Sequence, residues 1–582
     1  MQYRQNNWFQ RAFLVAIVLG CAVAMSPNVV GPDIWGHVQY GRDVFTDGYF
    51  APTTTYSFTA EGYRWINHEN FSELLMAIGA DTVGPVGLSV AKVLLSLLVI
   101  GLIVRHAITH KVHLLTICAI TLLVAVNMAF HWSVRPQLLS YTFFTLMIVL
   151  LLYCFDGWQN QWHLSRTLDE TSEVSETSEV WAFHSRLRWL WLAPVLFFFW
   201  ANSHGGFVAG FCIYSAYLVC RSIEAYIQRG RESYGLLRRF ALMIVVAGLA
   251  TLINPYGPGL HLWLLQSLGE PRPEITEWAS PEFFTLDSIK LWLIVGLFAA
   301  AIIASRKSRD FTHLVIMALT LWQSLEHLRH LPFFAILFGF WMPMHIQSLF
   351  NRMKFAREDQ QFGDDMSPAM KRLMFCGLSV AFILLVGRLT IRATDLQVDK
   401  ARFPVTAMQF IADHSMTGRM VVTYNWAQYV IGTFGTRDPD EQPGIQVAFD
   451  GRFRTCYPQE IVDMSFDLTL GDMVERHRSE NTKSRDDSHV LEFKKPDLAL
   501  LSRSQPHSQR VMKQNTARWV LLYQDEIAQL WGRRTKYDEP TSPHFIHPVD
   551  RKIGDDVQEG YVTWPALPVG RIANPSFAQQ TD

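Results

Sequence analysis

The chain has no excess of charge of either sign. Its 582 residues include 51 Lys and Arg against 52 Asp and Glu, which gives a formal net charge of −1. Without a basic excess, the composition gives no sign of a nucleic-acid partner, and the sequence has no acidic tail. Bulk charge therefore excludes little else, and the class of protein has to be inferred from how the residues are distributed.

Cysteine is scarce in the polar part of the chain, and the common soluble-enzyme motifs are missing. Only Cys456 lies outside the apolar runs, so no disulfide can form within the C-terminal part, and no cysteine spacing is typical of a zinc site. The sequence has no phosphate loop, nucleophile elbow, His-Glu-x-x-His or Cys-x-x-Cys motif. Nucleotide-driven mechanisms of the soluble kind therefore have no motif here.

The sequence is instead rich in long apolar runs over residues 1–390. A helix needs about 17 to 25 residues to cross a hydrocarbon core of roughly 30 Å, or somewhat fewer when its ends are polar. We identify eleven such segments, approximately over 12–30, 86–104, 113–130, 138–155, 189–201, 206–220, 240–256, 291–305, 311–325, 331–349 and 373–389. The pattern predicts a mainly α, polytopic transmembrane bundle.

Lys and Arg in the connecting loops predict the orientation of this bundle. With a cytoplasmic N-terminus, the inner loops hold 20 of these residues and the outer loops six. We therefore expect the N-terminus inside and, with eleven spans, the C-terminal part outside the cytoplasmic (inner) membrane. A cleaved signal peptide is the alternative for the first segment, because Arg4 and Arg11 precede an apolar stretch. In both cases the first loop, residues 31–85, lies outside.

From residue 391 the pattern changes to that of a water-soluble domain. Apolar residues at helical spacing predict a helix over 404–414, and a short run of β-branched and apolar residues predicts a strand over 420–424. We expect a small extracytoplasmic α/β domain over 391–535. The tail over 536–582 is rich in proline, glycine and charge, and we expect it to be irregular.

Ionisable residues lie in the first outer loop. Asp33 and His37 follow the first apolar run, and Glu69 precedes an amphipathic helix that begins at Asn70, has Glu73 three residues later and would lie in the interface plane. Asp33 could be a general base for an acceptor hydroxyl or a ligand for a divalent cation. A solvated surface acid is the alternative.

Basic and polar residues also lie in the other predicted outer loops. Arg135, Arg329 and His330 could bind the phosphate of a lipid. Snorkelling to headgroups and local salt bridges are the alternatives. Irregular backbone at membrane depth is tolerated where it lines a cavity. We therefore expect an outward-facing cavity lined by Asn202, His204, Asn254 and Glu277.

Several of these segments carry a family resemblance. The run Gly31-Pro32-Asp33-Ile34-Trp35-Gly36-His37, with the later pair His68-Glu69, resembles the first loop of the GT-C class of polytopic glycosyltransferases, the class of protein mannosyltransferases and oligosaccharyltransferases. The motifs that look closer still to a group of uncharacterised bacterial multipass membrane proteins, distantly related to that class, are Arg135-Pro136-Gln137, the run 200–206, Asn254-Pro255-Tyr256-Gly257 and Asp450-Gly451-Arg452.

The resemblance implies a lipid-phosphate-linked sugar as donor and Asp33 as the acidic residue of the first loop. The chain departs from the commoner pattern because that loop has no adjacent acidic pair and no Asp-x-Asp at this point. Glu69 could supply a second carboxylate. The need for a metal therefore stays open at this point.

The sequence thus predicts a membrane glycosyltransferase of the cell envelope. It would transfer a sugar from a polyprenyl-phosphate donor to an acceptor on the outer side, with Asp33 as base and with His37 and Glu69 positioning the acceptor or a divalent cation. The three basic residues named above would neutralise the departing phosphate. The alternative is a non-enzymatic multipass protein, such as a lipid or polysaccharide transporter or an assembly partner. Sugar, acceptor, oligomeric state and the role of the C-terminal domain stay open.

Overall fold

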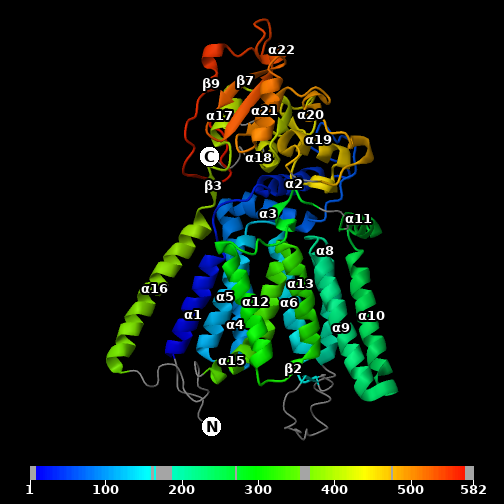
Figure 1. The fold of residues 1–582 in the computed structure, drawn as a ribbon, viewed down its shortest axis with the longest axis vertical. Coiled ribbons are helices and arrows are strands. Elements are labelled where there is room, and N and C mark those ends of the chain that lie inside the picture. The colour runs from blue at the N-terminus through cyan, green and yellow to red at the C-terminus, as the bar shows by residue number, and fades with distance from the viewer. Residues whose placement is uncertain are drawn as a thin grey trace. The chain divides into compact units, whose positions relative to one another are not determined.

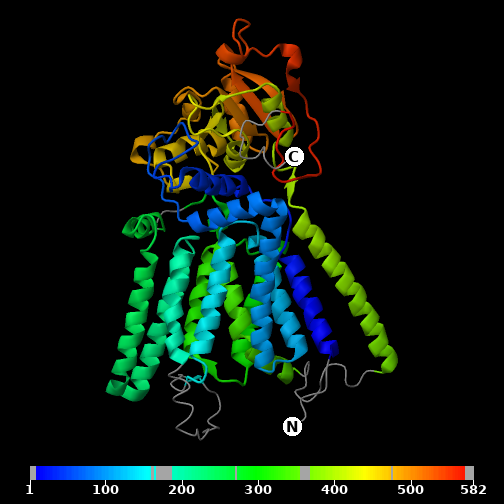
Figure 2. The same ribbon diagram turned by 180° about the vertical axis from the view of Figure 1, so that it is seen from behind.

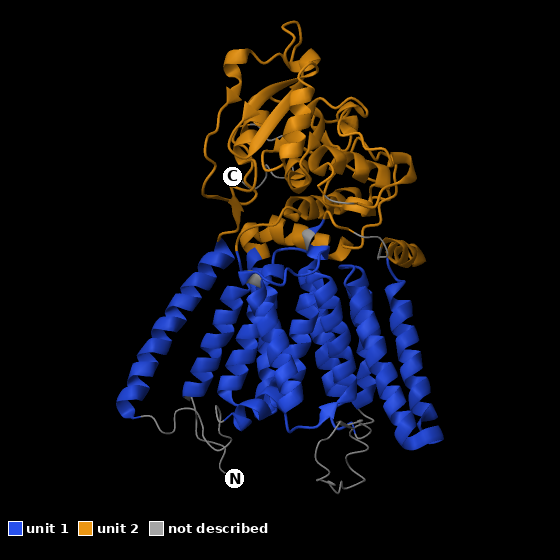
Figure 3. Cartoon of the chain, in the orientation of Figure 1, with its two compact units in different colours: residues 1–27, 89–254, 275–394 blue, residues 28–88, 255–274, 395–582 orange. Residues whose placement is uncertain are grey.

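The computed structural model describes residues 8–158, 163–164, 186–268, 272–353, 367–473 and 476–570. The chain divides into two compact units (Figure 3). The helical unit comprises residues 1–27, 89–254 and 275–394. The mixed unit comprises residues 28–88, 255–274 and 395–582. The predicted first outer loop and the predicted C-terminal domain thus belong to one compact unit, whereas the sequence pattern predicts two different domains.

The helical unit is a bundle of apolar helices (Figure 1, and from behind in Figure 2). Its helices are α1 (Trp8–Ala24), α4 (Pro85–Thr109), α5 (Leu114–Met128), α6 (Gln137–Cys154), α8 (Leu192–Ala201), α9 (Phe207–Arg229), α10 (Tyr234–Thr251), α12 (Ile289–Ala304), α13 (Phe311–Glu326), α14 (Leu331–Trp341), α15 (Pro343–Arg352) and α16 (Pro368–Thr394). Each of the eleven predicted segments overlaps a helix, and the tenth overlaps two.

Length and composition identify the membrane-crossing helices among those described. Five are long and apolar enough, or six if the pair around the bend of 63° between α14 and α15 is one span. A mainly α, multi-pass membrane protein is thereby confirmed, whereas eleven spans and an inside N-terminus stay predictions. Every residue of α14 is buried, but only 6% of the span of α16 is. A helix that is apolar and buried all round belongs at the centre of a bundle.

The mixed unit contains a six-stranded sheet of order β5-β4-β6-β8-β7-β9. Its strands are β4 (Gly418–Val422), β5 (Ile445–Val447), β6 (Leu498–Ser502), β7 (Trp519–Gln524), β8 (Ala528–Arg533) and β9 (Lys552–Ile553). Strand β4 runs parallel to both β5 and β6, whereas β8 runs antiparallel to β6 and β7. All five residues of β6 are buried, as expected for a strand covered on both faces. The predicted α/β region is thereby confirmed.

Helices and a short second sheet complete the mixed unit. The helices that matter below are α2 (Ile34–Asp47), α3 (Asn70–Val83), α11 (Pro258–Leu268), α17 (Val405–Asp413) and α18 (Ala427–Phe434). The tail differs from the expected irregular segment, since β9 pairs with β7 and β10 (Tyr561–Thr563) pairs with β3 (Gln397–Asp399). Residues 571–582 of that tail lie outside the described residues.

Candidate functional site

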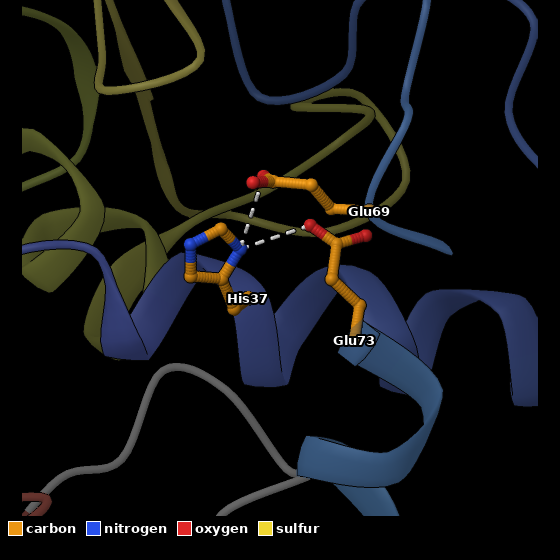
Figure 4. A group of neighbouring side chains, drawn as sticks. All are labelled: His37, Glu69 and Glu73. Atoms are coloured by element: carbon orange, nitrogen blue, oxygen red, sulfur yellow. Dashed lines mark hydrogen bonds and ion pairs between the residues drawn. The ribbon is translucent and has the colours of Figure 1, made fainter. Parts of the chain in front are cut away.

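A histidine and two glutamates from the predicted first outer loop meet in the mixed unit (Figure 4). His37 lies in the first turn of α2, Glu69 directly precedes α3, and Glu73 lies in the first turn of α3. The Nδ1 atom of His37 lies 3.0 Å from Oε1 of Glu73 and 3.9 Å from Oε2 of Glu69. One possible ligand atom from each residue lies within 4.8 Å of the other two.

Small residues bring the two helices of this cluster close together. A Cβ atom on Gly41 of α2 would collide with the backbone oxygen of Glu73 and would lie 2.8 Å from Cβ of Ala77. Because Gly41 lies one turn after His37, this close packing also places His37 beside Glu73. The Nδ2 atom of Asn67 donates a hydrogen bond of 2.6 Å to the other oxygen of Glu73 and fixes the carboxylate.

The two carboxylates change the protonation of His37. Burial alone would lower the pKa of His37, but the hydrogen bond with Glu73 and the charges of Glu69, Glu73 and Asp33 outweigh it and raise that pKa. His37 and Glu73 are both buried. A buried charge needs a partner, so the imidazolium and the carboxylates compensate each other.

The donor atoms of this cluster fit a divalent cation. One imidazole nitrogen and two carboxylates form a mixed donor set. Such a set suits Zn²⁺ or Mn²⁺ better than it suits Ca²⁺ or Mg²⁺, which prefer sites made of oxygen atoms alone. A cation there would replace the proton of His37 as the positive charge between Glu69 and Glu73. Glu73 was not predicted as a site residue. Glu73 shares its helix face with the small residues Ala77 and Ala80, but its partners His37 and Asn67 lie outside α3, so the sequence alone does not select it.

Asp33 lies one turn before His37, at the N-cap position of α2. Its backbone oxygen accepts a hydrogen bond from the N–H of His37, while its side chain does not cap the helix. Instead, Oδ1 of Asp33 points toward the turn after β5, 2.8 Å from the position that a Cβ atom on Gly451 would take. The structure thus brings Asp33, His37 and Glu69 into one neighbourhood.

The motif Asp450-Gly451-Arg452 forms a buried brace in the mixed unit. The guanidinium of Arg452 lies 4.7 Å from the ring centroids of both Tyr40 and Trp65, and its Nη2 donates 2.8 Å to Asp450. The hydroxyl of Tyr457 donates to the same carboxylate at 2.5 Å. This saturated network holds the turn beside Asp33 in place.

The predicted phosphate-binding residues gather in the helical unit. Arg135 donates a hydrogen bond of 2.6 Å to Glu277, and the guanidinium of Arg329 lies 4.4 Å from the ring centroid of Trp278. Burial alone would raise the pKa of Glu277, but the charges of Arg135 and Arg329 lower it. The ring of His330 lies 6.4 Å from that of Trp278. Glu277, expected to line a cavity, is therefore the carboxylate that both arginines face.

The remaining predicted lining residues make local contacts in the helical unit. Asn202 donates to the backbone oxygens of Phe198 and Ile253, and Asn254 donates to that of Thr251. His204 is buried, and its Nδ1 atom lies 2.9 Å from Oγ of Ser140 and accepts a hydrogen bond from the N–H of Gly206. These contacts brace the loops that follow α8 and α10, and the lining role stays a prediction.

No family model and no curated protein matches the sequence. Solved structures match it at low identity. An oligosaccharyltransferase from Archaeoglobus fulgidus, tethered with an acceptor peptide, is 9% identical with a TM-score of 0.49, over 85% of this chain and 70% of that chain. ArnT from Cupriavidus metallidurans, bound to undecaprenyl phosphate, is 14% identical with a TM-score of 0.45, over 90% of this chain and 98% of that chain. At these identities and TM-scores the likeness does not extend to activity or to single residues.

Proposed function

We propose that the chain is a membrane glycosyltransferase that transfers a sugar from a polyprenyl-phosphate donor to an acceptor hydroxyl on the outer side of the membrane. The observation that carries the proposal is the cluster of His37, Glu69 and Glu73 with Asp33 one helical turn away. A carboxylate beside a site that can hold a cation is suited to removing a proton from an acceptor while the positive charge stabilises the developing anion.

Each residue of the mixed-unit cluster has a separate role in this proposal. Asp33 accepts the proton of the acceptor hydroxyl as the oxygen attacks the anomeric carbon of the sugar. His37, Glu69 and Glu73 would hold the divalent cation, which supplies a fixed positive charge. Glu73 and Asn67 keep the ring of His37 in its orientation.

The basic residues of the helical unit would bind the phosphate of a polyprenyl-phosphate lipid. Arg135 and Arg329 carry permanent charges and planar donor groups that match phosphate oxygens. Glu277, which accepts a hydrogen bond from Arg135, would yield this guanidinium to the phosphate. His330 adds a further nitrogen at the same end of α14.

Replacement of Asp33 tests this proposal directly. Asp33→Asn keeps the size of the side chain but removes the base, so we expect release of polyprenyl phosphate from polyprenyl-phosphate sugars to fall by about 100-fold or more. The matched control is Glu61→Gln, which changes an exposed acid of the same segment. A folded Asp33→Asn protein that releases the lipid phosphate at the parental rate would show that Asp33 is not the base.

The phosphate site is tested by binding of undecaprenyl phosphate, with undecaprenol as the uncharged probe. In Arg329→Gln we expect affinity for the phosphate to fall by about tenfold or more, because a charged hydrogen bond to phosphate is lost. Affinity for undecaprenol should stay unchanged. Equal affinity of the parent for the two lipids would exclude a phosphate site at these residues.

A further inference from the structure

A buried glutamine of the α/β region lies between two glycines of the mixed unit. Gln428, in the first turn of α18, is 2% exposed. A Cβ atom on Gly36 of α2 would collide with its side-chain amide, and one on Gly451 would lie 2.8 Å from its Nε2 atom. The absence of both side chains therefore leaves the space that Gln428 occupies.

This amide borders the same small space as the carboxylate of Asp33. Oδ1 of Asp33 also lies 2.8 Å from the position of a Cβ atom on Gly451, so it is at most twice that distance from Nε2 of Gln428. Among the residues that the structure describes, Oε1 of Gln428 is buried and has no hydrogen-bond partner. The amide donor and the carboxylate thus lie on either side of the position that a side chain on Gly451 would occupy.

Packing alone does not explain a glutamine at this position. Helix α18 approaches α2 closely, because Gly432, one turn after Gln428, would place a Cβ atom 2.9 Å from Cβ of Trp35. The ring centroids of Trp35 and Tyr429 lie 4.5 Å apart, with the two rings tilted by 30°. An apolar side chain would fill such a tight interface without leaving a buried oxygen unpartnered, which is unfavourable. The amide therefore needs a role besides filling space.

We propose that Gln428 is a positioning residue, whose Nε2–H donor holds the carboxylate of Asp33 in the orientation that proton transfer requires. Gly36 and Gly451 provide the room for this pair, and the α/β region thereby contributes a residue to the reaction centre. The inference rests on the proposed function for the role of Asp33 as base. Helix α18 would then position the carboxylate of Asp33 in addition to packing against α2.

The variant Gln428→Met separates a hydrogen-bonding role from a packing role. Methionine has nearly the volume and flexibility of glutamine but donates no hydrogen bond. We expect a melting temperature that is unchanged or higher, because the unpartnered oxygen is removed, an unchanged KM, and a kcat lowered by about tenfold, the cost of one hydrogen bond to a charged group. Gln409→Met on α17 is the control. Parental kcat in Gln428→Met would overturn the proposal in favour of packing.

A double variant tests whether Gln428 acts through Asp33. In the Asp33→Asn background, Gln428→Met should lower the residual rate no further, because the group that it positions is already gone. If the second change lowers the residual rate by the same factor as in the parent, Gln428 acts independently of Asp33 and the inference is wrong.

A third measurement needs no sugar substrate. Asp33 is labelled with a carbodiimide and glycine ethyl ester at fixed pH, and the labelled peptide is quantified by mass spectrometry against the peptide of exposed Glu61. Labelling of Asp33 should become several-fold faster in Gln428→Met, and an unchanged rate would overturn the proposal. If Asp33→Asn instead keeps the parental activity, the proposed function fails, and this labelling still decides whether Gln428 holds Asp33.

Discussion

At the scale of single residues, helix α2 holds two groups that bind protons more tightly than usual. The carboxylates around His37 outweigh its burial and raise its pKa. For Asp43, burial raises the pKa to about 6, although Arg437 and the hydrogen bonds from Gln39 and Tyr56 act in the opposite direction. Neighbouring negative charges thus raise the pKa of His37, whereas burial raises the pKa of Asp43 on the same helix.

The raised pKa of His37 predicts how the cluster binds a cation. Only neutral imidazole is a ligand, so the affinity for Mn²⁺, measured by calorimetry, should increase as the pH rises through the pKa of His37. Glu73→Gln should lower the affinity by at least about tenfold, whereas Glu61→Gln should leave it unchanged. Binding that is independent of pH, or equally tight in Glu73→Gln, would show that this cluster is not a cation site.

Asp43 predicts a dependence of stability on pH. Its pKa is 3.8 in ordinary surroundings and about 6 in the folded protein, so folding favours its protonated form. This stabilisation is complete below about pH 4 and is lost as the pH rises through 6, where ionised Asp43 costs about 3 kcal/mol. Asp43→Asn should therefore raise the melting temperature at pH 7.5 and leave it unchanged at pH 3.5. An equal gain at both pH values would point to another cause.

At the scale of elements, local spacing predicts where a helix lies better than which face it buries. The start of α3 at Asn70 follows from the polar residue before an apolar run, and this prediction is confirmed. The apolar positions Leu75 and Ile78 are exposed, while Glu73 and Ala77 are buried against α2. The contact with α2 alone determines which face of α3 is buried. That contact depends on Gly41, which lies 36 residues before Ala77. An exposed apolar face is what an interfacial helix needs, and the interfacial placement stays a prediction.

The contact between α2 and α3 can be tested at Gly41. In Gly41→Ala the new Cβ atom meets the backbone of Glu73 and forces α3 to move, which should cost about 1–3 kcal/mol of folding free energy. Affinity for Mn²⁺ should fall as well, because the two helices carry its ligands. The control Gly235→Ala lies in α10 with open space around its Cβ position and should be neutral or slightly stabilising. Equal stability of the two variants would contradict the close packing.

At the scale of the whole molecule, composition predicts two kinds of structure but not how the chain is divided between them. Apolar runs identify the helical unit because each helix satisfies its own backbone in lipid. The mixed unit also includes residues 28–88 and 255–274. Long-range contacts that no local sequence pattern predicts join its segments, such as the guanidinium of Arg452 between Tyr40 and Trp65. Asp33 and His37 could be selected from their position in the sequence. Glu73 and Gln428 could not, because their partners lie on other elements.

The predicted orientation can be checked with single cysteines and a membrane-impermeant maleimide, with each site followed by peptide mass spectrometry. Glu61→Cys and Asp440→Cys lie at exposed positions of the mixed unit and should react in intact cells. Lys307→Cys, exposed between α12 and α13, should react only after permeabilisation. Reaction of Lys307→Cys in intact cells, or protection of Glu61→Cys, would contradict an inside N-terminus and an outside mixed unit.

The brace around Arg452 has a consequence for biosynthesis. Tyr40 and Trp65 leave the ribosome hundreds of residues before Arg452, whose guanidinium packs against both rings. Their aromatic surface therefore stays exposed while the intervening helices are inserted. Until translation reaches the last third of the message, the segment that carries Asp33 and His37 lacks part of its core. A chain released early, by a stop codon or by cleavage, would therefore retain its membrane helices but present an unfinished segment to quality-control proteases.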